Sequence, residues 1–249
     1  MLSAKSSPSK TPDIAFISDQ QLSAISPFPG SGYSVLPSGQ IRPGGAFAVN
    51  IPLAYAPDRL GGAVSVNIAQ NRSNQSITNA NGRNGTASVG VGFGVARRPV
   101  WISAQYLSNE SFQTGGDAVY NALLQLAPET SSVPAIAIGV QDIDNGRERS
   151  PFLVATKQLR AARPLFATLG VGRGRFAGST IFGGISYSPA DRVSLDAEYD
   201  GLQLNVGAGY AVTQRVSLMA SYNDLAKQTN RITAGILGRR YQFGLNYGF

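Results

Sequence analysis

Three carboxylates occupy alternate positions near residue 200: Asp196, Glu198 and Asp200. Residues two apart in a strand share a face, so a strand here would bring all three together. Paired carboxylates can serve as acid and base in glycoside hydrolysis. In a membrane barrel they would instead form an acidic strip in the lumen, balanced by inward Lys157 and Arg215, because charges belong there rather than in lipid. We favour the strip and take these five residues as candidate lumen charges.

Two further stretches contain residues that could bind ligands. Residues 170–178 (GVGRGRFAG) have glycine spacing suited to phosphate, but a dinucleotide site needs a helix directly afterwards, and residues 180–188 continue a strand pattern. Residues 142–146 (DIDNG) could begin a calcium loop. They lack the later Glu of that motif, and Asn-Gly is a common signal of a tight turn. We therefore expect no cofactor and no metal.

Composition restricts the chemistry further. The 249 residues include no Cys and no His. A thiol nucleophile, the usual general base and the commonest metal ligand are therefore missing, and we expect a protein without enzymatic activity. The formal net charge is +7, but the basic residues lie mostly at segment ends and turns. This placement favours contact with lipid phosphates and anionic glycans and argues against a nucleic-acid partner.

The last nine residues show the clearest structural pattern. Their large apolar residues alternate strictly with small or polar ones: Tyr241, Phe243, Leu245, Tyr247 and Phe249 against Gln242, Gly244, Asn246 and Gly248. Period two is that of a strand. A large apolar face with aromatics at both ends is typical of a transmembrane barrel strand with lipid outside and a polar lumen inside. We interpret the five large residues as a membrane-insertion signature.

Similar alternation recurs along most of the chain. Charged residues make up only 14%, Gly reaches 29 residues, and no apolar run is long enough for a membrane helix. We predict an all-β, antiparallel transmembrane β-barrel over residues 31–249, after a poorly structured N-terminal arm at 1–30. Residues 118–126 are ambiguous between helix and strand, and we favour a strand. The count is then about 14 strands, or 12 if the first hairpin, 31–37 with 46–55, does not join.

Recurring short turns indicate the topology. We expect those at 55–60, 97–99, 160–164, 187–193 and 210–216 to lie on the periplasmic side, where barrel turns are short. The inner face carries many glycines, which leave room for water, a ligand or a plug. Tyrosines near strand ends are expected to face lipid at the interfaces: Tyr55, Tyr106, Tyr187, Tyr210, Tyr222 and Tyr247.

Several motifs in residues 95–249 resemble one family. They are residues 134–143 (PAIAIGVQDI), 152–157 (FLVATK), 169–173 (LGVGR), 182–189 (FGGISYSP), 197–200 (AEYD) and 205–210 (NVGAGY). Residues 36–45 (LPSGQIRPGG) resemble the opening segment of the same family. The chain is thus similar to the YjbH-like outer-membrane β-barrels, which are linked to exopolysaccharide production. The resemblance implies a barrel that assists the passage of exopolysaccharide or polar solutes.

These patterns place the chain in the outer membrane of a Gram-negative-type bacterium. Residues 1–30 contain no apolar core of signal-peptide length, so an organellar outer-membrane barrel stays an alternative. Expected partners are outer-membrane lipid or lipopolysaccharide, polysaccharide, and other envelope proteins. A structural barrel that anchors a larger envelope assembly is the second functional hypothesis, and a soluble lipocalin-like binder is the third.

Overall fold

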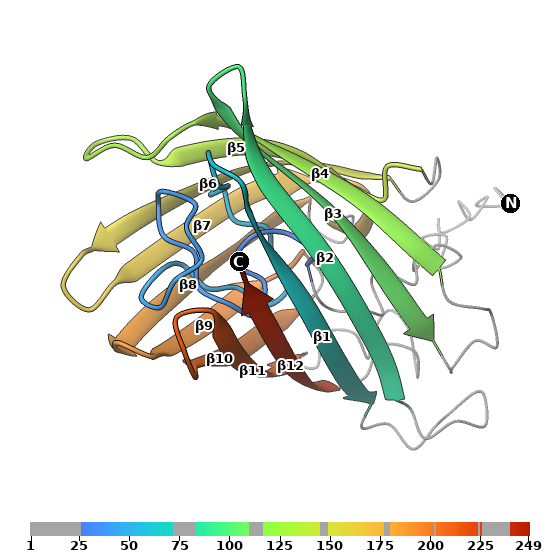
Figure 1. The fold of residues 1–249 in the computed structure, drawn as a ribbon. Coiled ribbons are helices and arrows are strands. Elements are labelled where there is room, and N and C mark those ends of the chain that lie inside the picture. Colours follow the sequence, from blue (N-terminus) through green and yellow to red (C-terminus); the bar gives the residue numbers. More distant parts are fainter. Residues whose placement is uncertain are drawn as a thin grey trace, which may run out of the picture.

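Twelve antiparallel strands close into one barrel in the computed structural model, which describes residues 26–71, 83–109, 117–144, 149–176, 180–201, 203–223, 225 and 240–249 (Figure 1). The strands are β1 (Gly61–Asn71), β2 (Arg83–Val95), β3 (Arg98–Asn109), β4 (Asp117–Ala127), β5 (Ala135–Gln141), β6 (Ser150–Arg160), β7 (Leu165–Gly172), β8 (Ile181–Ala190), β9 (Val193–Tyr199), β10 (Leu204–Ala211), β11 (Val216–Asn223) and β12 (Arg240–Gly248). A short 3-10 helix, η2 (Gly174–Phe176), follows β7. The predicted all-β barrel is confirmed.

The last strand closes the barrel on the first. Val64 of β1 lies opposite Tyr247 of β12. Beyond this ladder, the N–H of Gly62 donates to the carbonyl of Phe249 at 3.0 Å, and the N–H of Phe249 donates back at 2.9 Å. Closure satisfies the backbone groups that an open edge would leave unpaired.

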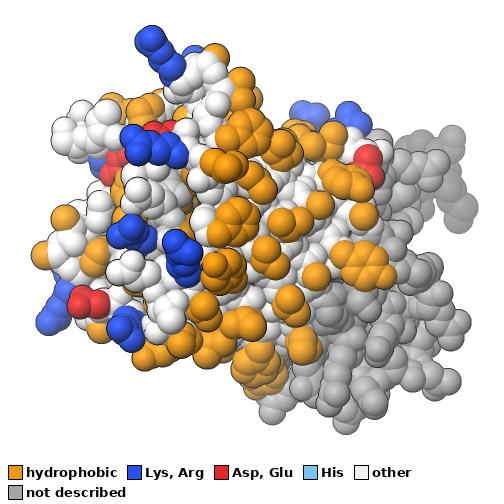
Figure 2. All heavy atoms as spheres, viewed as in Figure 1, with side chains coloured by type: hydrophobic (Ala, Val, Ile, Leu, Met, Phe, Trp, Pro, Cys, Tyr) orange, Lys and Arg blue, Asp and Glu red, His pale blue; other side chains and the backbone are white. Residues whose placement is uncertain are grey.

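Side chains alternate between an apolar exterior and a largely polar interior. On β1, Val64, Val66 and Ile68 are exposed, while Ser65 and Asn67 are buried. Apolar side chains cover the strands in the space-filling view (Figure 2). Such an exterior would be unfavourable in water and suits lipid, so the barrel is of the transmembrane type.

The expected first hairpin does not join the wall, so the count of 14 strands is wrong and the alternative of 12 is correct. Residues 26–60, here called the lumen segment, run through the inside of the barrel and become exposed at residues 58–60 (Figure 1). The first wall strand begins at Gly61 rather than near residue 31. Prolines remove ladder donors from this segment, and glycines such as Gly30 and Gly39 take positive φ. A continuous strand is therefore interrupted. The expected arm at 1–30 lies largely outside the described residues.

Residues 118–126 form part of β4, as predicted. Val119, Asn121 and Leu123 point inward and are buried, whereas Tyr120 is exposed outside. Period-two burial therefore outweighs the helix propensity of this stretch. Among the described residues, no helix is long and apolar enough to cross a membrane.

Five short connections lie at one end of the barrel, here called the short-turn end. They are residues 96–97, 128–134, 161–164, 191–192 and 212–215. Four predicted turns, 97–99, 160–164, 187–193 and 210–216, fall at this end. The fifth, 55–60, does not join two strands. It leads from the lumen segment into β1.

Candidate functional site

The lumen segment folds back on itself inside the barrel. The N–H of Gly32 donates to the carbonyl of Ala48 at 2.9 Å, and Val35 and Ala46 exchange two hydrogen bonds of 2.8 Å. From Ala46 to Pro57 every residue is buried, on both faces of the chain. The segment is therefore surrounded by the wall and occupies space that a channel would need.

Aromatic side chains join the lumen segment to the wall. The rings of Phe28 and Phe152 meet edge to face with centroids 5.0 Å apart, and Tyr55 meets Phe166 at 6.2 Å. On the wall side, Phe176 and Phe182 stack at 4.4 Å. Buried aromatic rings contribute much of a core's apolar area, so this part of the lumen is a packed core.

The inward glycines explain how bulky groups fit in so narrow a lumen. A Cβ at Gly90 would lie 2.1 Å from the Trp101 ring, and one at Gly209 would lie 2.8 Å from Phe47 of the lumen segment. A Cβ at Gly207 would meet Val49 at 2.4 Å. Glycine is therefore required where rings or the lumen segment lie directly on the sheet.

A buried carboxylate holds the middle of the lumen segment. Glu198 of β9 accepts hydrogen bonds from the N–H groups of Val49 at 3.1 Å, Asn50 at 2.6 Å and Ile51 at 3.4 Å. Arg175 of η2 donates to the carbonyl of Asn50 at 3.0 Å. Glu198 thus binds the N–H of Asn50, and Arg175 binds its carbonyl. Hydrogen bonds to charged groups are stronger than those between neutral groups.

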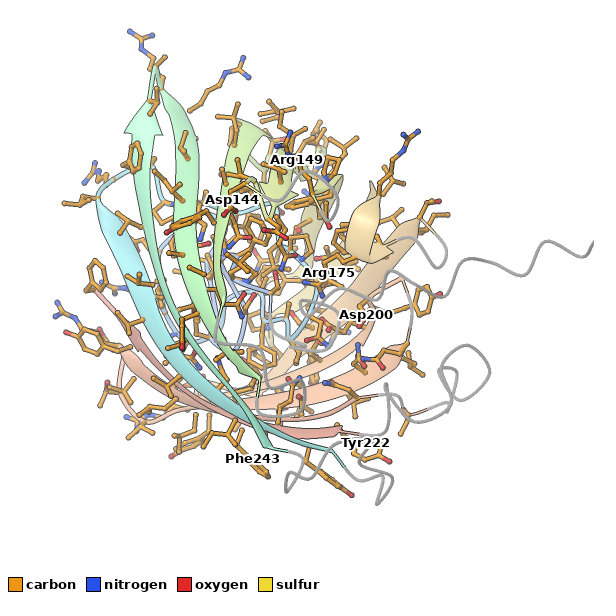
Figure 3. The ribbon with its side chains drawn as sticks, turned by 90° about the vertical axis from the view of Figure 1, so that its right-hand side faces the viewer. Asp144, Arg149, Arg175, Asp200, Tyr222 and Phe243 are labelled. Atoms are coloured by element: carbon orange, nitrogen blue, oxygen red, sulfur yellow. The ribbon has the colours of Figure 1, made fainter. Side chains whose placement is uncertain are left out.

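Arg175 is the cation that accompanies the buried carboxylates. Its guanidinium also donates to Gln141 at 2.9 Å and lies over the Phe176 ring. Burial lowers the pKa of Arg175, and the charges of Asp200 and Glu198 act in the opposite direction. Both Arg175 and Asp200 are buried, and Asp200 is near enough for its charge to act on the guanidinium (Figure 3). Sequence reasoning missed Arg175, because it lies in the Gly-rich stretch that was considered only for phosphate binding.

Side chains of other strands bind the backbone of the same segment. The side chains of Trp101 in β3 and Asn246 in β12 donate to the carbonyls of Pro27 at 3.0 Å and Gly32 at 2.8 Å. Side-chain oxygens accept from backbone N–H groups in three further strands: Gln125 of β4 from Ala56 at 3.2 Å, Thr156 of β6 from Ala54 at 3.0 Å, and Ser186 of β8 from Phe47 at 3.1 Å. Anchors therefore come from all around the wall, and the lumen segment is held as part of the fold.

Glu129, in the β4–β5 connection, fixes the end of the segment near β1. It accepts hydrogen bonds from the hydroxyl of Tyr55 and the N–H of Gln158, and forms an ion pair with Lys157 at 3.3 Å. Burial, and then the Glu129 carboxylate, raise the pKa of Tyr55 above its ordinary value. Tyr55 is therefore a lumen residue, and its expected position facing lipid is wrong.

The structure separates the five candidate lumen charges into two groups. Asp196, Glu198 and Asp200 are buried on the inner side. Lys157 instead pairs with Glu129, and Arg215 is exposed in the β10–β11 turn. Lys157 and Arg215 therefore do not balance the acidic strip as expected, and Arg175 is the cation that lies beside it.

The glycosidase alternative finds no support in this geometry. The Glu198 carboxylate is covered by the lumen segment and already accepts three backbone hydrogen bonds. It offers no access to a substrate. Among the described residues, no group of three or more acidic side chains is placed to hold a metal ion.

The residues of the proposed insertion signature all lie on the exterior. Tyr241, Phe243, Leu245, Tyr247 and Phe249 are exposed by 38% to 57%, whereas Gln242 and Asn246 are buried. Phe243 lies on the outer side of the wall in Figure 3. Of the other tyrosines expected at the interfaces, Tyr106 and Tyr210 are exposed, and Tyr187 and Tyr222 are half-buried. Tyr222 lies against Tyr241 with ring centroids 5.0 Å apart.

Comparison with known families agrees with the motifs found in the sequence. A family model described as "Exopolysaccharide biosynthesis protein YbjH" matches residues 25–181. The chain belongs to this family. The match confirms the resemblance and covers the lumen segment together with β1 to β7. None of the curated proteins matches the chain.

Solved structures of similar shape are outer-membrane barrels. The KdgM porin is 12% identical, with a TM-score of 0.49 over 75% of this chain and 99% of its own. Outer membrane phospholipase A from Escherichia coli is 10% identical, with a TM-score of 0.45 over 78% and 92%. A triple mutant of the Rhodopseudomonas blastica porin is 7% identical, with a TM-score of 0.41 over 76% and 99%. Likeness at this level is confined to the barrel shape.

Proposed function

We propose that this chain is a non-enzymatic barrel of the outer membrane in a Gram-negative-type bacterium and a closed, anchoring component of an envelope assembly that makes exopolysaccharide. The observation that carries this proposal is the lumen segment, which is packed inside the barrel and bound from many strands. The family match supports the link to exopolysaccharide and spans this segment. The apolar exterior supports insertion among outer-membrane lipids.

The packing favours anchoring over free passage. Opening a path would break the bonds of Glu198 and Arg175 to the segment and separate the ring contacts of Phe28 and Tyr55. Each buried group left without its partner costs about 1–3 kcal/mol. A barrel built in this way holds its shape in the membrane and presents its rims and loops to other envelope components.

Gated passage of exopolysaccharide or polar solutes is the second candidate, and polar groups of the inner wall favour it. Among the described residues, the buried side chains of Asn67, Thr86 and Asn223 have polar atoms without hydrogen-bond partners. Such groups are costly in a dry interior and would be satisfied by water or sugar hydroxyls in an open lumen. This candidate requires the lumen segment to move.

A reversible tether distinguishes the two candidates. The hydroxyl oxygens of Ser34 in the lumen segment and Ser194 in β9 are 2.8 Å apart, and the chain contains no Cys. A Ser34→Cys/Ser194→Cys variant should therefore form a disulfide that holds the segment inside. We expect cells that carry only the tethered chain to produce exopolysaccharide at the level of the unaltered chain, since anchoring does not need an open lumen.

Two controls complete the experiment. Ser34→Cys alone tests the effect of substitution without a tether, and a reducing agent restores freedom to the double variant. Production that fails with the tether and returns on reduction would overturn the anchoring role and establish gated passage. In planar bilayers, we expect the unaltered chain to be silent.

A further inference from the structure

A cavity of about 570 Å³ opens at the short-turn end, beside the β10–β11 turn. Both the lumen segment and the wall line it. Gln40, Arg42, Asp58 and Arg59 come from the segment and its link to β1, and Gln214 and Arg215 come from the β10–β11 turn. Its volume lies within the range of about 300–1,000 Å³ that is usual for small-molecule sites.

The charge of the lining is predominantly positive. Three arginines, Arg42, Arg59 and Arg215, and one acidic residue, Asp58, are among the residues that line it. Arg42 and Arg215 also line a smaller adjoining pocket together with Arg192. Guanidinium groups bind carboxylates in a bidentate manner, and the amides of Gln40 and Gln214 can both donate to and accept from hydroxyl groups.

The backbone around the cavity is held in place. The N–H of Gly39 donates to the carbonyl of Leu36 at 2.8 Å, in the turn that presents Gln40 and Arg42. In the β10–β11 turn, the N–H of Arg215 donates to the hydroxyl of Thr213 at 3.1 Å. The carbonyl of Arg215 accepts a hydrogen bond of 2.7 Å from the N–H of Gly248. Fixed loops reduce the entropy lost when a ligand binds.

We propose that this basic cavity binds a carboxylated segment of polysaccharide. The inference rests on the proposed function, because exopolysaccharide production supplies the glycan. Guanidinium groups would bind the carboxylates, and the Gln amides would bind the ring hydroxyls. The lumen segment lines much of the cavity, which places the site at the barrel mouth, and Phe249 of the exterior face borders it. Two Gln amides beside the arginines favour a glycan with several ring hydroxyls over a lipid headgroup. Further Lys and Arg side chains surround this end of the molecule (Figure 2).

The test is a binding measurement on the full chain in detergent. The probes are a fluorescent oligogalacturonate, a neutral dextran oligomer of similar length, and glycerol phosphate, a soluble equivalent of a lipid headgroup. We expect binding of the oligogalacturonate that weakens as salt is raised, and none of dextran. The variant Arg42→Gln/Arg59→Gln/Arg215→Gln should bind the oligogalacturonate about tenfold more weakly, because each exposed charge pair contributes modestly.

A matched control separates this cavity from general positive charge. Arg97→Gln/Arg160→Gln/Arg163→Gln removes the same charge from exposed positions in or directly beside other short turns, outside the cavity, and should change binding less than threefold. Equal losses in the two triple variants would overturn the proposal, as would binding of glycerol phosphate without binding of the oligogalacturonate, or no glycan binding at all. The single variant Arg59→Gln repeats the test if a triple variant does not fold.

This experiment is independent of the anchoring role. A chain that binds the glycan but is dispensable for exopolysaccharide production would contradict only the proposed function. A chain that is required for production but binds no carboxylated glycan would contradict only the cavity assignment.

Discussion

The carboxylate of Glu198 accepts a hydrogen bond of 2.6 Å from the backbone N–H of Asn50, which lies 148 positions earlier in the chain. This contact joins a wall strand to the middle of the lumen segment. Two neighbouring N–H groups bind the same carboxylate. The contact therefore offers a direct way to measure how firmly the segment is held.

Replacing Glu198 by Gln should loosen the segment locally. The amide has one acceptor oxygen and turns an NH₂ group toward the donors, so at least one charge-assisted hydrogen bond is lost. Such a bond contributes about 1.5–3 kcal/mol. In hydrogen–deuterium exchange, the amides of Val49, Asn50 and Ile51 should exchange roughly ten- to a hundredfold faster. Asp58→Asn, at an exposed site, is the control and should leave them unchanged. Unaltered exchange in both variants would show that the carboxylate does not hold the segment.

A methyl group at Gly90 should destabilise the barrel. The new Cβ would lie 2.1 Å from the buried Trp101 ring, so the ring must move. Overpacking of this kind costs about 1–3 kcal/mol. We expect Gly90→Ala to lower the free energy of unfolding by this amount in urea titrations of the chain in lipid vesicles. Ala87→Val adds volume on the exposed face of the same strand and should be close to neutral. Similar losses in both would contradict the packing described here.

A charge at Phe243 should oppose membrane insertion. The side chain is 57% exposed on the exterior of β12. Arg on the lipid face costs about 2–4 kcal/mol near the bilayer midplane and less near the interface. We expect Phe243→Arg to reduce the fraction of chain that inserts into liposomes, and Phe243→Leu to retain it. Full insertion of the Arg variant would mean that this face does not meet lipid.

Alkaline pH should weaken the lumen packing through Tyr55. Burial and the Glu129 carboxylate raise the pKa of Tyr55 in the folded chain, while an unfolded tyrosine titrates near 10. The stability from this group is therefore fully present below about pH 10 and is lost as the pH rises toward the folded value. Urea midpoints between about pH 8 and 11.5 should fall more steeply for the unaltered chain than for Tyr55→Phe. Parallel curves would exclude this contribution.

Local patterns were enough to predict the wall strands. In β12 and β1, one face meets the exterior and the other the lumen, so side chains alternate with period two and the pattern can be read along a few residues. The family motifs are also contiguous stretches, and the family match covers those that lie before residue 182. Strand direction then follows from short turns, because consecutive antiparallel strands reverse at each one.

The alternating pattern does not distinguish the lumen segment from a wall strand. Residues 46–55 alternate in size like the wall, yet both of their faces are buried inside the barrel. The pairing of Glu198 and Arg175 with Asn50, and that of Lys157 with Glu129, likewise depend on which strands the closed barrel brings together. Alternation in the sequence shows that the two faces of a strand lie in different environments, but it does not show what those environments contain. Only tertiary structure decides which distant residues share the enclosed space, because barrel closure sets those distances.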